Sequence, residues 1–379
     1  MKKIYQQIQL RNLLQIGDDA ELIAERIRKA NDPDCSRSII AEWSFASALN
    51  QLGLPADPSE NSQSQQLADI SLTQRLKLYE NIGYVSPALI FLAPGPGMAA
   101  FVIAGLGTAE QQRQFFAPFR QGLHWSCFAM TEPGTGSDAR AMRCQAERVK
   151  GGFRLSGEKM LIGNGTLADI GVVFARTAEG ALGVDAFIFH PQSEGVRRRR
   201  LHLNGLDGIS LARLTFDNLF IPDEQALGQH LKPTERFARS AMATFDALRP
   251  CVGAIALGVA RRALDDWQYH ALAACPGLSG MFCHAGRELD AAYLRASRLC
   301  QQLDEHLTPD CTPGMSKTHS VKVAESIITR LIHALPAEIT TLHHRLWQAY
   351  RDVKAFEYTE GTRQIHLLNH TVMPLSEAY

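Results

Sequence analysis

Two short stretches of the chain contain the residues best suited to chemistry. Near the end, FEYTEGTRQ (356–364) places a single carboxylate, Glu360, directly before Gly361 and Thr362. A Glu-Gly pair alone is typical of a turn with a solvated side chain. A second stretch far upstream, CFAMTEPGTGSDA (127–139), strengthens a functional interpretation of Glu360.

The composition is that of an ordinary globular protein. The 379-residue chain has a formal net charge of zero, with 21% charged and 45% hydrophobic residues. This balance indicates neither a nucleic-acid partner nor disorder, and the length predicts two or three domains. The chain contains no apolar run suited to a signal peptide or a membrane span. Eight cysteines without paired spacing favour free thiols, so we expect a cytoplasmic protein.

The elements that must position the two stretches follow from the sequence pattern. Residues 1–122 carry apolar side chains at helical spacing, and residues 123–230 contain short β-rich runs separated by Gly, Asn and Asp. Residues 231–379 return to helical periodicity. We therefore predict an α+β chain with an N-terminal helical domain, a middle β domain and a C-terminal four-helix bundle.

The expected elements can be placed more closely. Thr108, with Gln111 three residues later, predicts a capped helix start. The expected strands lie in the runs 153–161, 170–177, 185–191 and 212–222. The expected bundle helices cover 249–269, 286–307, 315–335 and 338–355.

Several common sites find no support in the sequence. The chain has no P-loop, no dinucleotide-binding glycine motif between a strand and a helix, and no GxSxG elbow. His and Cys residues lack the spacing of a zinc site, so we expect no metal. The basic run at 197–200 lacks interleaved aromatic residues and indicates a solvated domain edge.

Five blocks together resemble the acyl-CoA dehydrogenase family. They occur in the family's order over about residues 70 to 370. The blocks are MTEPGTGSD (130–138), GEKMLIGNGTLADIGVVFAR (157–176), FDNLFIPDEQALG (216–228), FDALRPCVGAIALGVARRALDDW (245–267) and TEGTRQI (359–365). The resemblance implies the family's fold, in which the middle domain is barrel-like, and a homodimer or homotetramer.

The resemblance also implies a reaction. Family members remove the α-proton of an acyl thioester with a carboxylate, while N5 of FAD accepts the β-hydride. Glu360 matches the base, and burial is expected to raise its pKa toward the working pH. The backbone N–H of Glu360 matches one of the two groups that bind the thioester carbonyl.

Further site residues are implied by position. The residues that match flavin contacts are Phe128, Met130, Thr131, Gly136, Ser137, Thr362 and Gln364. The residues that match substrate contacts are Ser137, Asp246, Arg249 and Gly361. Turn and N-cap chemistry is the alternative for the hydroxyl residues Thr131, Ser137 and Thr362. A structural ion pair is the alternative for Arg249.

The chain departs from the family at three places that usually contact FAD. Leu161-Ile162-Gly163 stands where the family usually has Trp-Ile-Thr. Ala274 aligns with an arginine that reaches the FAD pyrophosphate of a neighbouring subunit, and Pro336-Ala337 aligns with an adenosine-binding Gly-Gly pair. Losing such contacts weakens cofactor binding.

Three hypotheses follow from these matches and departures. The first is FAD-dependent α,β-dehydrogenation of an acyl thioester, carried by CoA or, as in natural-product branches of the family, by a carrier protein. The sequence does not specify the electron acceptor. The second is a non-redox enzyme in which Glu360 abstracts the α-proton before elimination, isomerisation or decarboxylation. The third is a scaffold protein without activity, which retention of the base makes less favourable.

Overall fold

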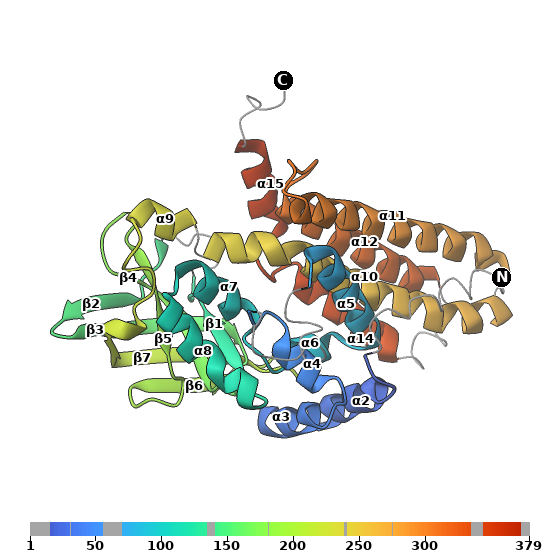
Figure 1. The fold of residues 1–379 in the computed structure, drawn as a ribbon. Helices are drawn as coiled ribbons and strands as arrows, with labels where there is room; N and C mark the ends of the chain where they lie inside the picture. Colours follow the sequence, from blue (N-terminus) through green and yellow to red (C-terminus); the bar gives the residue numbers. More distant parts are fainter. Residues whose placement is uncertain are drawn as a thin grey trace.

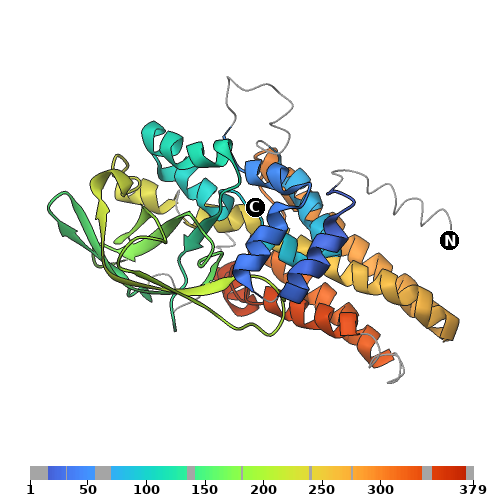
Figure 2. The ribbon, with the colours of Figure 1, turned by 90° about the horizontal axis from the view of Figure 1, so that it is seen from below.

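Helices at both ends of the chain flank a single β-sheet. The computed structural model describes residues 16–30, 32–55, 70–134, 141–180, 182–238, 241–274, 276–334 and 344–372. The sheet forms one half of the molecule and the long C-terminal helices form the other, with the N-terminal helices between them (Figures 1 and 2). The N-terminal helices are α2 (Ala20–Ala30), α3 (Pro33–Ala41), α4 (Ala46–Gln51), α5 (Leu72–Val85), α6 (Pro87–Phe91), α7 (Gly97–Leu106) and α8 (Ala109–Gln121).

Two of these helices begin with reciprocal caps. The Thr108 hydroxyl accepts a hydrogen bond from the Gln111 backbone, and the Gln111 side chain accepts one from the Thr108 backbone. The predicted helix start is therefore confirmed. Ser71 and Gln74 form the same box at the start of α5. Each box satisfies two N–H groups that a helix start leaves unpaired.

The middle of the chain forms a curled seven-stranded sheet. Its order is β1-β4-β2-β3-β7-β6, with β5 paired to β4. The strands are β1 (Ser126–Ala129), β2 (Gln145–Val149), β3 (Gly152–Gly163), β4 (Ile170–Arg176), β5 (Val184–Phe189), β6 (Val196–Arg200) and β7 (Leu211–Pro222). The predicted runs correspond to β3, β4, β5 and β7 and do not include β1, β2 or β6. The basic run lies on the edge strand β6, which pairs with β7 and exposes Arg197, Arg198 and Arg199, in agreement with the predicted solvated edge.

Strand β4 shows why the sheet has two cores. Ile170, Val172 and Phe174 point to the core shared with α7 and α8, while Val173 and Ala175 point to the core enclosed by the curled sheet. Successive side chains of a strand face opposite sides, so a strand covered on both sides reads as a continuous apolar run. This arrangement fixes β1, which pairs with β4, close to the helices.

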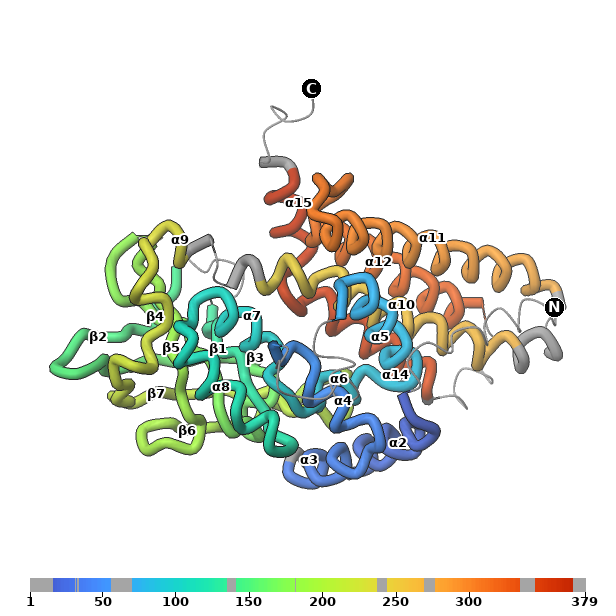
Figure 3. Tube along the Cα trace, in the orientation of Figure 1, coloured from blue at the N-terminus to red at the C-terminus, as the bar shows by residue number. Residues whose placement is uncertain are grey.

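The C-terminal part forms a bundle around one long helix. The elements after the sheet are α9 (Pro233–Ala238), α10 (Ala241–Ala274), α11 (Ser279–Asp304), α12 (Pro313–Ala334), α14 (His344–Phe356) and α15 (Arg363–Val372), with short 3₁₀ turns at Asp223–Gln225 and Pro276–Leu278. Helices α10, α11, α12 and α14 are the predicted four-helix bundle, and α10 runs from the sheet into it (Figure 3). The predicted start of the last helix, at 338, lies outside the described residues.

Helix α5 belongs to the same core as the bundle. It lies against α10 so closely that a Cβ on Gly83 would stand 2.8 Å from the Cα of Ile255. Glycine permits such an approach of two helix backbones. Helices α2 to α6 therefore share one apolar core with the C-terminal bundle, whereas α7 and α8 pack against the sheet. No helix among the described residues is long and apolar enough to span a membrane.

Candidate active site

The candidate base lies in the tight turn between α14 and α15. Glu360 has a φ of 56°, and Gly361 follows with a φ of 104°. The left-handed region is unfavourable for a residue with a side chain, so other contacts must hold Glu360 in place. Such constrained residues are concentrated at functional sites.

Two buried cations hold this turn from two different helices. The Lys317 ammonium of α12 donates to the carbonyl oxygens of Glu357 and Gly361, at 3.1 Å and 2.7 Å. The Arg249 guanidinium of α10 donates from Nε to the carbonyl of Glu360, at 3.2 Å. Three carbonyls of one turn are therefore fixed by charged donors, which form stronger hydrogen bonds than neutral ones.

One carboxyl oxygen of Glu360, Oε2, is enclosed and has no hydrogen-bond partner among the described residues. Burial raises the pKa of Glu360 to about 8, against the opposing effect of the Arg249 and Lys317 charges. Burial also lowers the pKa of the Lys317 ammonium to about 8. The site thus contains a carboxyl group that can exchange a proton near neutral pH.

A neutral histidine packs beneath the turn. His366 is 2% exposed, and burial lowers its pKa to about 4. Gly314 and Gly361 both lie against its ring, and a Cβ on either would clash with it. Its Nε2 atom is enclosed and has no hydrogen-bond partner in the described part of the chain. The ring therefore fills space under the base without adding charge.

The start of α10 contacts both the sheet and the turn that contains Glu360. The ring of Phe245 lies 5.6 Å from that of Phe128 and 5.4 Å from the Arg249 guanidinium carbon. Arg249 also forms a 2.7 Å ion pair with Asp246. The structure thus brings Phe128, Asp246, Arg249 and Glu360 into one region, although they come from three parts of the chain.

The strand that ends at this region is anchored by a buried ion pair. The Lys159 ammonium of β3 donates to the Glu132 carboxylate at 2.8 Å and to the Met130 carbonyl at 3.0 Å. Glu132 also accepts hydrogen bonds from the backbone N–H groups of Arg143 and Cys144. Glu132 and Lys159 are 5% and 0% exposed. Glu132, in the MTEPGTGSD block, therefore has a structural role, and the sequence analysis did not predict that role.

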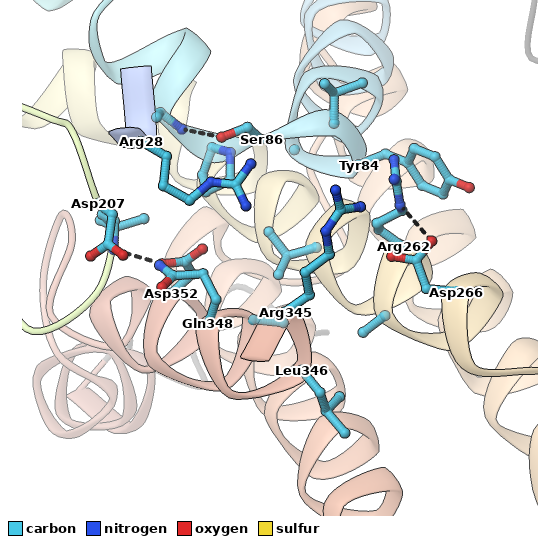
Figure 4. A pocket seen from close by; sticks show the side chains of 18 of the residues that line it. Arg28, Tyr84, Ser86, Asp207, Arg262, Asp266, Arg345, Leu346, Gln348 and Asp352 are labelled. Atoms are coloured by element: carbon cyan, nitrogen blue, oxygen red, sulfur yellow. Dashed lines mark hydrogen bonds and ion pairs between the residues drawn. The ribbon is translucent and has the colours of Figure 1, made fainter. Parts of the chain in front are cut away.

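A surface pocket lies away from the candidate base. Its volume is about 100 Å³, and Figure 4 shows Arg28, Arg262, Asp266 and Asp352 in its lining. It lies between α2, α10 and α14 and contains none of the predicted site residues. The shifted pKa of Glu360 therefore indicates the active site better than this pocket does.

Two family models match most of the sheet and the C-terminal helices. Residues 127–219 match the family model described as acyl-CoA dehydrogenase, middle domain, and residues 238–371 match the C-terminal domain model. The short-chain specific acyl-CoA dehydrogenase of Sus scrofa is 30% identical over 291 residues, covering 73% of this chain and 68% of the relative. The chain belongs to the acyl-CoA dehydrogenase family.

Two further comparisons support this assignment. The CarC subunit of the caffeyl-CoA reductase-Etf complex of Acetobacterium woodii is 27% identical, covering 73% of this chain and 76% of the relative. The solved structure of butyryl-CoA dehydrogenase from Megasphaera elsdenii shares the fold, with a TM-score of 0.78 at 22% identity, covering 94% and 97% of the two chains. The acyl-CoA dehydrogenases are flavin oxidoreductases, so this protein is one as well, with FAD as its cofactor.

The described residues fit a flavin beside β1. This strand is at the end of the sheet order, so one of its edges faces no strand among the described residues. Phe128, Met130 and Thr131 are half-buried there, and the carbonyls of Met130 and Thr131 already accept hydrogen bonds from Lys159 and from the Met160 backbone. N–H groups along a strand edge need polar partners, and the polar edge of a flavin ring offers them.

The other predicted cofactor residues have different positions. Gly136 and Ser137 lie outside the described residues. Thr362 precedes α15, and its hydroxyl accepts a 3.5 Å hydrogen bond from the Ile365 backbone, as an N-cap does. Gln364 is exposed on the same helix. The N-cap alternative for Thr362 is therefore observed, and a cofactor contact from it stays a prediction.

Some of the residues that depart from the family pattern lie in the described part of the chain. Leu161 has a φ of 61° and is 45% exposed, so an apolar side chain stands open where the family usually has Trp. Gly163 ends β3 two residues later. Ala274 ends α10, and its side chain, like Pro336 and Ala337, lies outside the described part.

Sequence reasoning missed Lys317 and His366. Lys317 lies on the apolar face of α12, since Val321, Ala324 and Ile328 follow at helical spacing and all are buried. A lone lysine on such a face is a signal that could have been found, because lysine is rarely buried without a polar partner. His366 carried no comparable signal.

Proposed function

We propose that this protein dehydrogenates an acyl thioester between its α- and β-carbons, with Glu360 as the base. The observation that carries the proposal is the enclosed Glu360 carboxyl, unpaired at Oε2 and with a pKa raised to about 8. A general base works best when its pKa is near the working pH. A solvated turn glutamate would have no such property.

The surrounding charges suit proton transfer in both directions. Burial favours the neutral acid that forms once Glu360 has taken the α-proton. Arg249 and Lys317 favour the carboxylate that must be present beforehand. Both cations bind carbonyls of the same turn, so they hold the base in position while they tune its pKa.

The remaining bonds of the reaction follow from the chemistry. When bound, FAD accepts the hydride that leaves the β-carbon, and the double bond forms between the two carbons. We propose that the Glu360 backbone N–H polarises the thioester carbonyl, which acidifies the α-proton. We assign substrate contacts to Ser137, Asp246, Arg249 and Gly361, and cofactor contacts to Phe128, Met130, Thr131, Gly136, Ser137, Thr362 and Gln364.

Partners are proposed from the relatives. The Acetobacterium relative is a subunit of a caffeyl-CoA reductase-Etf complex. We propose an electron-transferring flavoprotein as the acceptor here, and a homodimer or homotetramer as the assembly. The acyl carrier is either CoA or the phosphopantetheine arm of a carrier protein, and pantetheine thioesters represent the part that the two share.

The test begins with the visible spectrum of the protein purified with added FAD. We expect bound flavin that bleaches when an acyl thioester is added under anaerobic conditions. Glu360→Gln should keep the flavin and lose the bleaching. Glu357→Gln is the matched control, because its side chain accepts a hydrogen bond from the Arg363 backbone in the same turn. Equal bleaching by wild type and Glu360→Gln would refute the proposed role of the base.

A second candidate is proton abstraction without redox chemistry. Leu161 and Gly163 favour it, because they replace residues that usually contact the flavin. This candidate predicts turnover of a thioester by flavin-free protein, with loss of turnover in Glu360→Gln. Flavin bleaching on substrate addition would exclude it.

A further inference from the structure

One buried arginine near the candidate base has no counter-ion. Three arginines of the described chain are less than a tenth exposed: Arg75, Arg249 and Arg261. Arg249 pairs with Asp246, and Arg261 pairs with Asp290 and Glu80. Among the described residues, Arg75 of α5 has no ion pair with a carboxylate, and its Nε atom is enclosed without a hydrogen-bond partner.

The surroundings of Arg75 compensate its charge only weakly. Its guanidinium carbon lies 5.5 Å from the ring centroid of Phe101 on α7. Arg75 also forms a side-chain hydrogen bond with the Tyr79 hydroxyl. A Phe ring and a neutral hydroxyl compensate a buried cation much less than a carboxylate does, and burying a charge without a counter-ion is unfavourable. The site is therefore incomplete unless another group brings a negative charge or a strong acceptor.

Arg75 belongs to the same electrostatic region as the base. Burial raises the pKa of the Tyr79 hydroxyl, Arg75 opposes this rise, and the Glu360 carboxylate adds to it. Cys251 of α10 is likewise influenced by both Arg75 and Glu360. Tyr79 follows Arg75 by one helical turn, about 6 Å along α5. Tyr79 and Cys251 are thus close to both charged groups, and next to them Leu76 of α5 packs with Ala254 of α10.

The geometry points to a second recognition site for the substrate: we propose that Arg75 binds a carboxylate at the distal end of the acyl group. This inference rests on the proposed function, because it places the reacting carbons at Glu360 and the acyl chain along Tyr79 and Cys251. A guanidinium binds a carboxylate with strong, charge-assisted hydrogen bonds. The substrate class is then the monothioester of a dicarboxylic acid, and a plain aliphatic acyl chain would leave Arg75 buried and unpaired.

The test compares matched pantetheine thioesters on the FAD-loaded, full-length protein. Acyl groups of five, six and seven carbons are used, each ending in a carboxylate, a carboxamide or a methyl group. The readout is kcat/KM from flavin bleaching coupled to an artificial electron acceptor. We expect the carboxylate to exceed the methyl compound of the same length by roughly 10- to 100-fold at the best length, with the carboxamide between them.

Variants test whether Arg75 causes the preference for a carboxylate-ended acyl group. In Arg75→Met the carboxylate-to-methyl ratio should fall to one or below, whereas Arg75→Lys should keep part of it. Lys77→Met removes a positive charge two residues along α5, about 200° around the helix, and should keep the wild-type ratio. If Arg75→Met does not fold, Arg75→Gln replaces it, since it removes the charge and keeps a hydrogen-bond donor.

The outcomes separate this inference from the proposed function. A methyl compound that equals or exceeds the carboxylate at every length in the wild type overturns the inference and leaves the dehydrogenation intact. An unchanged ratio in Arg75→Met and Arg75→Gln overturns the role of Arg75. If none of the nine thioesters bleaches the flavin, the proposed function fails and the inference fails with it.

Discussion

Two buried acids of this molecule have opposite surroundings. Glu132 is fully satisfied: it pairs with Lys159 and accepts two backbone hydrogen bonds. Burial alone would raise the pKa of Glu132, but these bonds hold it below its ordinary value. Glu360 has an unpaired Oε2, and burial raises its pKa to about 8. Near each acid there is a buried lysine, yet only Lys159 bonds to the carboxylate itself.

The different surroundings of Glu132 and Glu360 suit different roles, one structural and one catalytic. A buried carboxylate whose acceptors are all used is fixed in one charge state and serves to hold the sheet together. A buried carboxyl that lacks partners can gain or lose a proton, and it meets a substrate without breaking an existing bond. Lys317 contributes to the second case because it binds the backbone of the turn and leaves the Glu360 side chain available.

The largest expected effect is on catalysis. Glu360→Gln keeps the shape of the side chain and removes the base, so kcat should fall by roughly 10²- to 10⁴-fold, the usual contribution of a general base. Glu132→Gln should not produce a loss of this kind at equal folded concentration. The measurement is the anaerobic rate of flavin bleaching. A Glu132→Gln variant that folds and loses as much activity as Glu360→Gln would break the comparison.

The next effect is on stability. Lys159→Met leaves Glu132 buried without its counter-ion and should lower the free energy of unfolding by about 3–5 kcal/mol. The double variant Lys159→Met/Glu132→Leu should recover part of this loss, because no unpaired charge remains. Urea unfolding of both variants checks the prediction. A single variant as stable as the wild type would show that the ion pair is not structural.

A pH-dependent difference in stability should follow from Glu360. Its pKa is raised from 4.5 to about 8 in the folded protein. The folded state therefore suffers no penalty from Glu360 below pH 4.5, and the free energy of unfolding decreases as the pH rises from 4.5 to 8. Glu360→Gln should gain stability over the wild type across this window, up to roughly 3–5 kcal/mol at about 1.4 kcal/mol per pKa unit. Denaturant unfolding of flavin-free protein from pH 5 to 8.5 measures the difference, which should be absent if the acid is solvated.

A smaller effect is expected from the lysine that shapes the turn. Lys317→Met leaves the carbonyls of Glu357 and Gly361 without their donor and removes a charge that lowers the pKa of Glu360. We expect kcat to fall by roughly tenfold and the alkaline rise of the pH–rate profile to move to higher pH. Lys322→Met, an exposed change on the same helix, is the control. A fall in kcat without a shift of the profile would limit Lys317 to a structural role.

The element types were largely predictable because they depend on local patterns. The capping box at Thr108, the apolar runs of β3, β4, β5 and β7, and the helical periodicity of the bundle are all read within a few residues. Strands β1 and β2 lie outside the predicted apolar runs, since β1 has only four residues and β2 is largely polar. Their place in the sheet depends on pairing with distant strands.

The family and the candidate base, Glu360, could be identified from the sequence because both depend on residue types in a fixed order. The surroundings that distinguish Glu360 from Glu132 became visible only in the folded chain. The burial of Glu360, the turn held by Lys317 and Arg249, and the unpaired Arg75 arise from helices that are distant in sequence. Desolvation and charge pairing depend on distance in space, and sequence order does not record that distance.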